Sequence, residues 1–190
     1  MPAAWCYTER VAAESGHVID KNLRLAAAVG ARTDVKAFPI GPVASQALEA
    51  VRRSVPGAFA VLNPGAAWPN KRWPAASFGA VARHLRDRHG LRSVVLWGPR
   101  EDALAREVIA ASADAAVAAP PTTLADLVAI AREARLVISG DTGPTHIAAA
   151  VGAPVVSLFG PTDPARNGPW SPDDVSLSRY ERCAYRRAHV

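Results

Sequence analysis

Residues 140–170 read GDTGPTHIAAAVGAPVVSLFGPTDPARNGPW. A short apolar run at 136–139 precedes them and is typical of a buried strand, which the glycine- and proline-containing turn at 140–144 ends. A compact helix of small and apolar residues follows and stops at Gly152, and 154–159 predicts a second buried strand. Strand, loop, helix and strand form a βαβ unit, whose ligands bind at the carboxyl ends of the strands.

The chain upstream of this unit alternates between helical and strand patterns. Helices are predicted at 20–30, 43–54, 75–89, 101–112 and 124–134, and strands at 59–62, 93–97, 115–118 and 136–139. This alternation is typical of a parallel sheet covered by helices on both faces, so the predicted class is α/β and Rossmann-like. We divide the 190 residues into an arm and linker (1–55), an α/β domain (56–178) and a basic tail (179–190).

Composition narrows the functional classes. No apolar run approaches the roughly 20 residues of a membrane span, and residues 1–16 lack the layout of a signal peptide, so we expect a cytoplasmic location. The cysteines, Cys6 and Cys183, lie far apart without metal-ligand spacing, which argues against a zinc site or a disulfide framework. The formal net charge of +5 is diffuse and fits an arginine-rich, solvated surface; no nucleic-acid-binding motif accompanies it.

Three sequence blocks carry a family resemblance. They are NPGAAWPNKRWP at 63–74 followed by Phe78, WGPRE at 97–101, and the 140–170 segment with its GDTG, nearby His and FGPTDP. In this order the blocks closely resemble glycosyltransferase family 9, the bacterial lipopolysaccharide heptosyltransferases. The resemblance covers 56–170 throughout and 17–30 more loosely.

The resemblance implies a fold and a reaction. The family's enzymes pair two Rossmann-like domains of the GT-B type, and this chain is similar to the carboxy-terminal, donor-binding one. The implied reaction transfers heptose from ADP-L-glycero-D-manno-heptose to a lipopolysaccharide core acceptor, with inversion at the anomeric carbon. The amino-terminal domain, which in the family binds the acceptor and supplies the base, is expected to be missing, so the chain would be a fragment, a split gene product or a degenerate half.

Two other functional classes remain open. One is a non-catalytic nucleotide-sugar-binding module, or pseudoenzyme, that works only beside a partner chain carrying an amino-terminal domain. The other, a nicotinamide-dependent oxidoreductase, is disfavoured because no GxGxxG follows the first strand. With a lipopolysaccharide acceptor, we expect at most peripheral association with the inner face of the bacterial inner membrane.

A nucleotide-sugar donor carries a diphosphate, which a helix amino terminus can bind through its free N–H groups. Thr142, Gly143 and Thr145 are therefore predicted to donate to phosphate, although Thr142 could equally serve as a helix cap. Asp141 is predicted to accept hydrogen bonds from sugar hydroxyls, the alternative being a turn aspartate that bonds its own backbone. His146, one helical turn further on, is either a phosphate donor or a structural histidine.

A fixed cation would stabilise the negative charge that develops on the departing diphosphate. Lys71 follows a strand and a proline-containing loop, and is predicted to neutralise that charge in the transition state, with Arg72 sharing the role; a solvated surface lysine is the alternative. Glu101 is predicted to bind the ribose hydroxyls or else to complement a helix dipole. Ala66 and Ala67 stand where better-studied family members have hydroxyl residues, a departure that affects phosphate or sugar contacts.

Metal chemistry is not expected. The sequence contains no HxH, HExxH or DxD motif, so the transfer would be metal-independent and would need no cofactor besides the ADP-heptose donor. If the chain acts alone, its own carboxylates, with Asp141 and Asp163 first, are the candidates for the base.

Overall fold

The computed structural model describes residues 9–12, 16–35 and 37–185. Cys6 and the last five residues of the predicted basic tail lie outside these ranges. Six parallel strands form one sheet in the order β3-β2-β1-β4-β5-β6. The strands are β1 (Phe59–Asn63), β2 (Arg92–Val95), β3 (Ala116–Ala118), β4 (Leu136–Gly140), β5 (Val155–Phe159) and β6 (Val175–Ser178).

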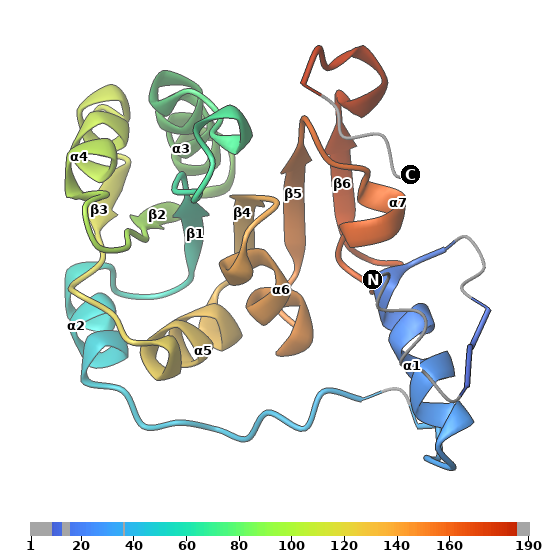
Figure 1. Cartoon of the computed structure of the whole chain (residues 1–190). Coiled ribbons are helices and arrows are strands. Elements are labelled where there is room, and N and C mark those ends of the chain that lie inside the picture. Colours follow the sequence, from blue (N-terminus) through green and yellow to red (C-terminus); the bar gives the residue numbers. More distant parts are fainter. Residues whose placement is uncertain (1–8, 13–15, 36, 186–190) are drawn as a thin grey trace.

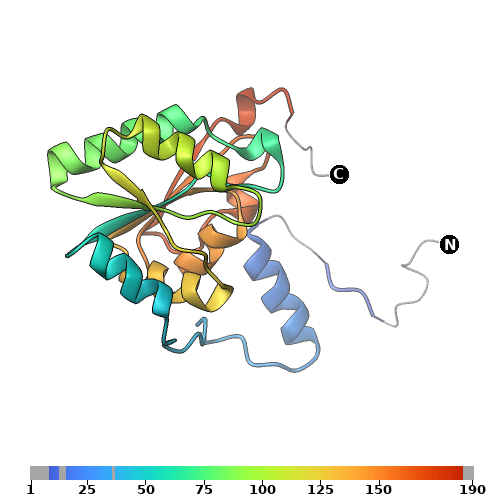
Figure 2. The same cartoon turned by 90° about the vertical axis from the view of Figure 1, so that its left-hand side faces the viewer.

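Helices cover both faces of this sheet (Figures 1 and 2). One face packs against α3 (Ala75–His89) and α4 (Asp102–Ala111). The other packs against α2 (Gln46–Ser54), α5 (Leu124–Glu133) and α6 (Gly143–Ala150). The predicted α/β, Rossmann-like class is therefore confirmed, with one apolar core on each side of the sheet.

The strand order creates a crossover at the middle of the sheet. From β1 the chain proceeds outward through β2 and β3, then returns to place β4 on the opposite side of β1. Val61 of β1 accordingly lies in register with Val94 on one side and Val137 on the other. In open α/β sheets, ligands bind outside the carboxyl ends of the strands at such a switch point. The loops after β1 and β4 therefore mark where a site should lie.

The amino-terminal part contains two different helices. Helix α1 (Val18–Ala28) has no buried residue and stands away from the sheet (Figure 2). Its cap residue His17 places Nε2 2.8 Å from the carbonyl oxygen of Gly168. Helix α2, in contrast, belongs to the core, with Val51 fully buried. No change in packing therefore occurs at residue 55, where we placed a domain boundary.

Several elements lie at or near their predicted limits. Helix α3 spans the predicted 75–89 and ends at Gly90, whose φ of 63° is the left-handed conformation that favours glycine. Strand β2 ends at Val95, two residues earlier than predicted. Four short elements were not predicted: η2 (Pro69–Lys71), α7 (Pro164–Asn167), β6 and η3 (Tyr180–Arg182). All residues of β6 are exposed, so it lacks the apolar pattern that identifies a buried strand.

Candidate functional site

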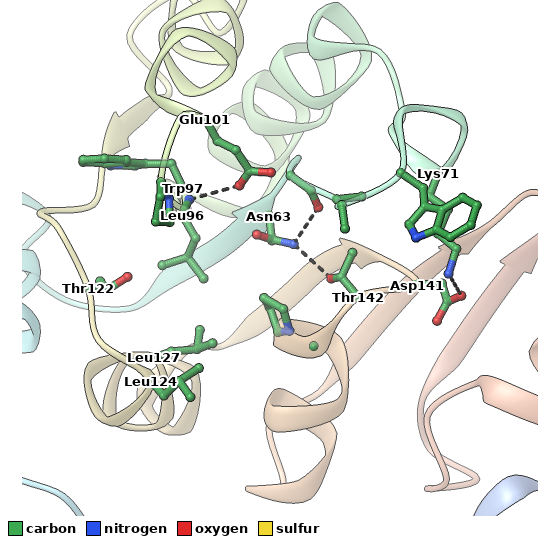
Figure 3. A pocket seen from close by; sticks show the side chains of 18 of the residues that line it. Asn63, Lys71, Leu96, Trp97, Glu101, Thr122, Leu124, Leu127, Asp141 and Thr142 are labelled. Carbon is green, nitrogen blue, oxygen red and sulfur yellow. Dashed lines mark hydrogen bonds and ion pairs between the residues drawn. The ribbon is translucent and has the colours of Figure 1, made fainter.

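A hollow of about 540 Å³ lies at the carboxyl ends of β1, β2 and β4, on both sides of the switch point (Figure 3). Its lining comes from the loop after β1, the turn after β2, the segment before α5 and the amino terminus of α6. Some of these segments are 70 or more residues apart in the sequence. The parallel strands bring them together at one edge of the sheet.

An ion pair occupies one end of the hollow. Lys71, the last residue of η2, places its Nζ 2.6 Å from Oδ2 of Asp141, which follows β4 directly. Thr162 donates its hydroxyl to the same oxygen at 2.7 Å. The Nε2 of His146 lies 3.7 Å from the other carboxylate oxygen. The Asp141 side chain is 9% exposed, so the pair is largely shielded from water.

This environment keeps Asp141 ionised. Burial opposes the charge, but interactions with His146, Lys71 and Thr162 outweigh burial and hold the pKa of Asp141 well below its ordinary value. A carboxylate with so low a pKa binds protons weakly and is a poor general base. Asp141 is better suited to orient Lys71 and to accept hydrogen bonds from a ligand.

Asn63, at the end of β1, joins two of the loops. Its amide nitrogen donates to Oγ of Ser139 at 2.9 Å, Oγ1 of Thr142 at 3.2 Å and the Gly65 carbonyl at 3.3 Å. Because the amide nitrogen faces these acceptors, the Asn63 oxygen points toward the opposite, apolar end of the hollow (Figure 3). Asn63 stands in the sequence block at 63–74, but we did not single it out; its position at the end of a fully buried strand is the signal that could have identified it.

A second carboxylate lies across the hollow from the ion pair. Glu101 accepts a hydrogen bond from the Gly98 N–H at 3.0 Å, and its other oxygen lies 3.6 Å from the Arg72 guanidinium. Arg72 also donates from Nε to the Ala66 carbonyl at 2.9 Å. A Cβ at Gly65 would collide with the Glu101 carboxylate. The loop after β1 and the turn after β2 are thus in close contact through Glu101.

The end of the hollow below Glu101 is apolar. It is lined by Leu96, Trp97, Leu124 and Leu127 (Figure 3). The Trp97 indole N–H donates to the Ala119 carbonyl at 2.8 Å, which fixes the ring. A flat aromatic group suits this end, whereas anionic groups suit the end with Lys71 and the amino terminus of α6.

The structure brings five of the seven predicted site residues to the hollow: Lys71, Glu101, Asp141, Thr142 and Gly143. Thr142 is the N-cap of α6, but its hydroxyl makes no capping bond and meets Asn63 and Ser139 instead.

The other two predicted residues do not line the hollow. Thr145 is buried and donates its hydroxyl to the Gly140 carbonyl, while its N–H donates to the Thr142 carbonyl. Its side chain therefore does not point at the place predicted for phosphate. His146 is 48% exposed and meets Asp141 from outside the hollow.

In residues 9–12, 16–35 and 37–185, no group of three or more His, Cys, Asp or Glu side chains could hold a metal ion. None of the helices described there is long and apolar enough to cross a membrane.

Known proteins share this fold. The crystal structure of a family 9 glycosyltransferase from Veillonella parvula superimposes with a TM-score of 0.74 and 24% identity, covering 91% of this chain and 52% of that one. The structure of E. coli heptosyltransferase WaaC with ADP superimposes with a TM-score of 0.71 and 22% identity, covering 93% of this chain and 55% of that one. At these identities the match shows the GT-B-type Rossmann-like fold.

Sequence relatives define the class more narrowly. Lipopolysaccharide heptosyltransferase 1 of Pseudomonas aeruginosa is 33% identical over 130 residues, which cover 68% of this chain and 36% of that protein. Lipopolysaccharide heptosyltransferase 3 of Escherichia coli is 33% identical over 175 residues, covering 87% and 51%. The chain thus spans about half, or less, of the length of these relatives.

These similarities place the chain in the glycosyltransferase class. The family model described as "Glycosyltransferase family 9 (heptosyltransferase)" matches residues 2–189. The chain belongs to glycosyltransferase family 9, which confirms the resemblance found in the sequence.

Proposed function

We propose that this chain supplies the donor-binding half of a lipopolysaccharide heptosyltransferase and that its hollow binds ADP-heptose. The Lys71–Asp141 ion pair beside the amino terminus of α6 carries the proposal, because it sets a fixed cation and free N–H groups at one end of the hollow. The diphosphate would lie there, the ribose at Glu101 and the adenine against Trp97 and Leu127.

In the proposed reaction, a hydroxyl oxygen of the acceptor attacks the anomeric carbon of the heptose. The bond from that carbon to the diphosphate oxygen breaks, and its electron pair leaves with ADP, so the configuration inverts. Negative charge grows on the departing diphosphate, and the ammonium of Lys71 stabilises it more in the transition state than in the ground state. No metal ion or further cofactor is needed for this step.

The hydroxyl proton must go to a base. The low pKa of Asp141 makes it a poor candidate. Asp163 accepts a hydrogen bond from the Ala165 N–H at 2.9 Å and caps α7, so its carboxylate is already engaged. We therefore assign the base, together with the acceptor site, to an amino-terminal half of the kind that the family resemblance implies; the chain spans about half, or less, of the length of its relatives. None of the described residues favours the non-catalytic alternative.

The same proposal places the reaction at the cytoplasmic face of the bacterial inner membrane. A lipopolysaccharide acceptor is anchored in that membrane, so the enzyme would meet it peripherally. The formal net charge of +5 would favour an anionic lipid surface. Sedimentation with vesicles containing anionic lipid, compared with neutral vesicles, tests this part.

Calorimetric titration of the 190-residue chain with ADP tests the donor site. We expect binding, and we expect Lys71→Ala to weaken it by about 1.5–3 kcal/mol, as for a lost hydrogen bond to a charged group. Lys21→Ala is the matched control, because Lys21 lies on α1, away from the hollow. Equal ADP affinity in both variants would rule out the role assigned to Lys71, and no binding by the unaltered chain would rule out the donor site itself.

A further inference from the structure

A cluster of three polar side chains lies beside the hollow, where β1 and β4 end. Asn63 is the last residue of β1, Ser139 lies in β4, and Thr142 is the N-cap of α6. Asn63 and Ser139 lie in register across the two strands and are 5% and 0% exposed. Asn63 and Thr142 belong to the lining of the hollow, whereas Ser139 lies behind it. The function proposed above makes no use of the contacts among these three residues.

The Gly65 carbonyl fixes the direction in which the Asn63 amide faces. It lies 3.3 Å from the amide group and can only accept a hydrogen bond, so the atom that faces it is the amide nitrogen. The same nitrogen lies 2.9 Å from Oγ of Ser139 and 3.2 Å from Oγ1 of Thr142, the second of which contacts is drawn in Figure 3. Asn63 therefore supplies protons to the cluster and takes none from it.

Two arrangements of the hydroxyl protons satisfy these contacts. The hydroxyl oxygens of Ser139 and Thr142 are 3.1 Å apart, and either can be the donor. In the first arrangement Thr142 donates to Ser139, whose own proton goes to the Gly140 carbonyl 3.3 Å away. In the second, Ser139 donates to Thr142, whose two lone pairs are then filled by Asn63 and Ser139. The Thr142 proton then has to point elsewhere, and because Thr142 lines the hollow, a ligand there can accept it.

An anion in the hollow would favour the second arrangement. A hydroxyl that donates to an anionic oxygen makes a charge-assisted hydrogen bond, which is roughly twice as strong as a neutral one. The change gives up only the 3.3 Å contact between Ser139 and the Gly140 carbonyl. Thr142 follows Asp141, the partner of Lys71, so this hydroxyl and the ammonium serve the same end of the hollow.

We propose that Asn63 is a positioning residue for the diphosphate: it donates to both hydroxyl oxygens, so that Ser139 can donate to Thr142 and the Thr142 proton is left for the anion. This role rests on the function proposed above, because the diphosphate is the anion concerned. Aspartate at position 63 would keep the shape and reverse the polarity. Its carboxylate would accept the protons of Ser139 and Thr142 and leave none for the diphosphate.

The test is a pair of NMR titrations of the isotopically labelled 190-residue chain, with ADP and with adenosine, which lacks the diphosphate. We expect Asn63→Asp to lower the affinity for ADP at least about tenfold, as for a lost hydrogen bond to a charged group, and to change the affinity for adenosine much less. Asn63→Ala should weaken ADP binding less than Asn63→Asp does. A role in packing alone predicts the opposite order, because aspartate fills the same space and alanine leaves a cavity.

A double-mutant cycle shows whether the effect passes through Thr142. Thr142→Val keeps the shape of the side chain, and no capping bond is lost with the hydroxyl. The loss of ADP affinity caused by Asn63→Asp should be at least about threefold smaller in the Thr142→Val background. Repulsion between the new carboxylate and the diphosphate would instead give the same loss in both backgrounds. Thr142→Val by itself should weaken the binding of ADP and spare that of adenosine, which keeps the proposal testable if Asn63→Asp does not fold.

Asn22→Asp is the matched control, because it adds the same charge on α1, away from the hollow, and should leave ADP affinity unchanged. Equal losses for ADP and adenosine, a larger loss in Asn63→Ala than in Asn63→Asp, additive effects in the double variant or an unaffected Thr142→Val would each overturn the positioning role and leave the donor site in place. Absence of ADP binding by the unaltered chain would instead overturn the proposed function, and this role with it.

Discussion

Asp141 should couple the stability of the fold to pH. Its pKa in the folded state lies below the ordinary value of 3.8, so the ionised carboxylate stabilises the fold above that pH, and the contribution is lost as the pH falls below it. We expect Asp141→Asn to lower the free energy of unfolding at pH 7 by about 1–3 kcal/mol, since Lys71 and Thr162 lose a charged partner. Urea denaturation between neutral and acidic pH measures the difference, which should shrink in acid.

Asp87→Asn is the matched control for that experiment. The Asp87 side chain is 57% exposed and pairs with Arg86 at the surface, so its loss should change stability little at any pH. A deficit in Asp141→Asn that stays constant down to low pH would contradict the role of its charge.

Gly65 should matter for nucleotide binding, because a side chain at this position would meet the Glu101 carboxylate. In Gly65→Ala, the added Cβ would displace the Glu101 side chain and weaken its contacts with Gly98 and Arg72. If Glu101 binds the ribose, ADP affinity falls about tenfold or more, while 2′,3′-dideoxy-ADP shows little difference. Gly41→Ala is the control, because a Cβ there meets no atom within 4 Å. Equal losses for both nucleotides would mean that the substitution acts on the loop and not through Glu101.

Helices α1 and α2 should respond differently to the same substitution. Leu48 of α2 is 7% exposed and packs in the core, whereas Leu25 of α1 is 54% exposed. Leu48→Ala should destabilise the fold by about 2–5 kcal/mol. Leu25→Ala should stay within about 0.5 kcal/mol. Chemical denaturation of both variants measures this, and similar losses would show that α1 is packed more firmly than its exposure indicates.

The elements also show what the sequence could and could not predict. Buried strands and amphipathic helices have local signatures, so β1, β4 and α3 were found near their limits. Strand β6 was missed because all of its residues are exposed, and η2 is too short to have a periodicity. The family motifs identified Lys71 and Asp141 separately, but their pairing joins residues 70 positions apart and appears only in the folded chain. For the same reason the sequence could not show that Thr145 turns its hydroxyl into the protein.

The 190-residue chain alone should transfer no heptose at a useful rate. Its hollow offers a cation and donor contacts, but Asp141, the carboxylate of the ion pair, is a weak base. General-base assistance is worth about 10²–10⁴-fold, and loss of acceptor positioning adds to that deficit. A radiolabelled-donor assay measures transfer without and with an amino-terminal half added in trans or fused. Robust transfer by the chain alone would contradict the prediction, and Asp141 and Asp163 would then be the first candidates for the base.

The single turn at Pro69–Lys71 carries the ammonium of the proposed donor site, and this would give the domain a means of thermodynamic linkage. Whatever factor a nucleotide in the hollow applies to the affinity for a second ligand beside this turn, that ligand must apply to the nucleotide in return. The sign of that coupling follows from charge and order together: a second anion beside one ammonium is repelled, whereas a turn already immobilised by one ligand costs the next less entropy. A turn three residues long would thus set the order in which the ligands of the complete transfer site arrive and leave.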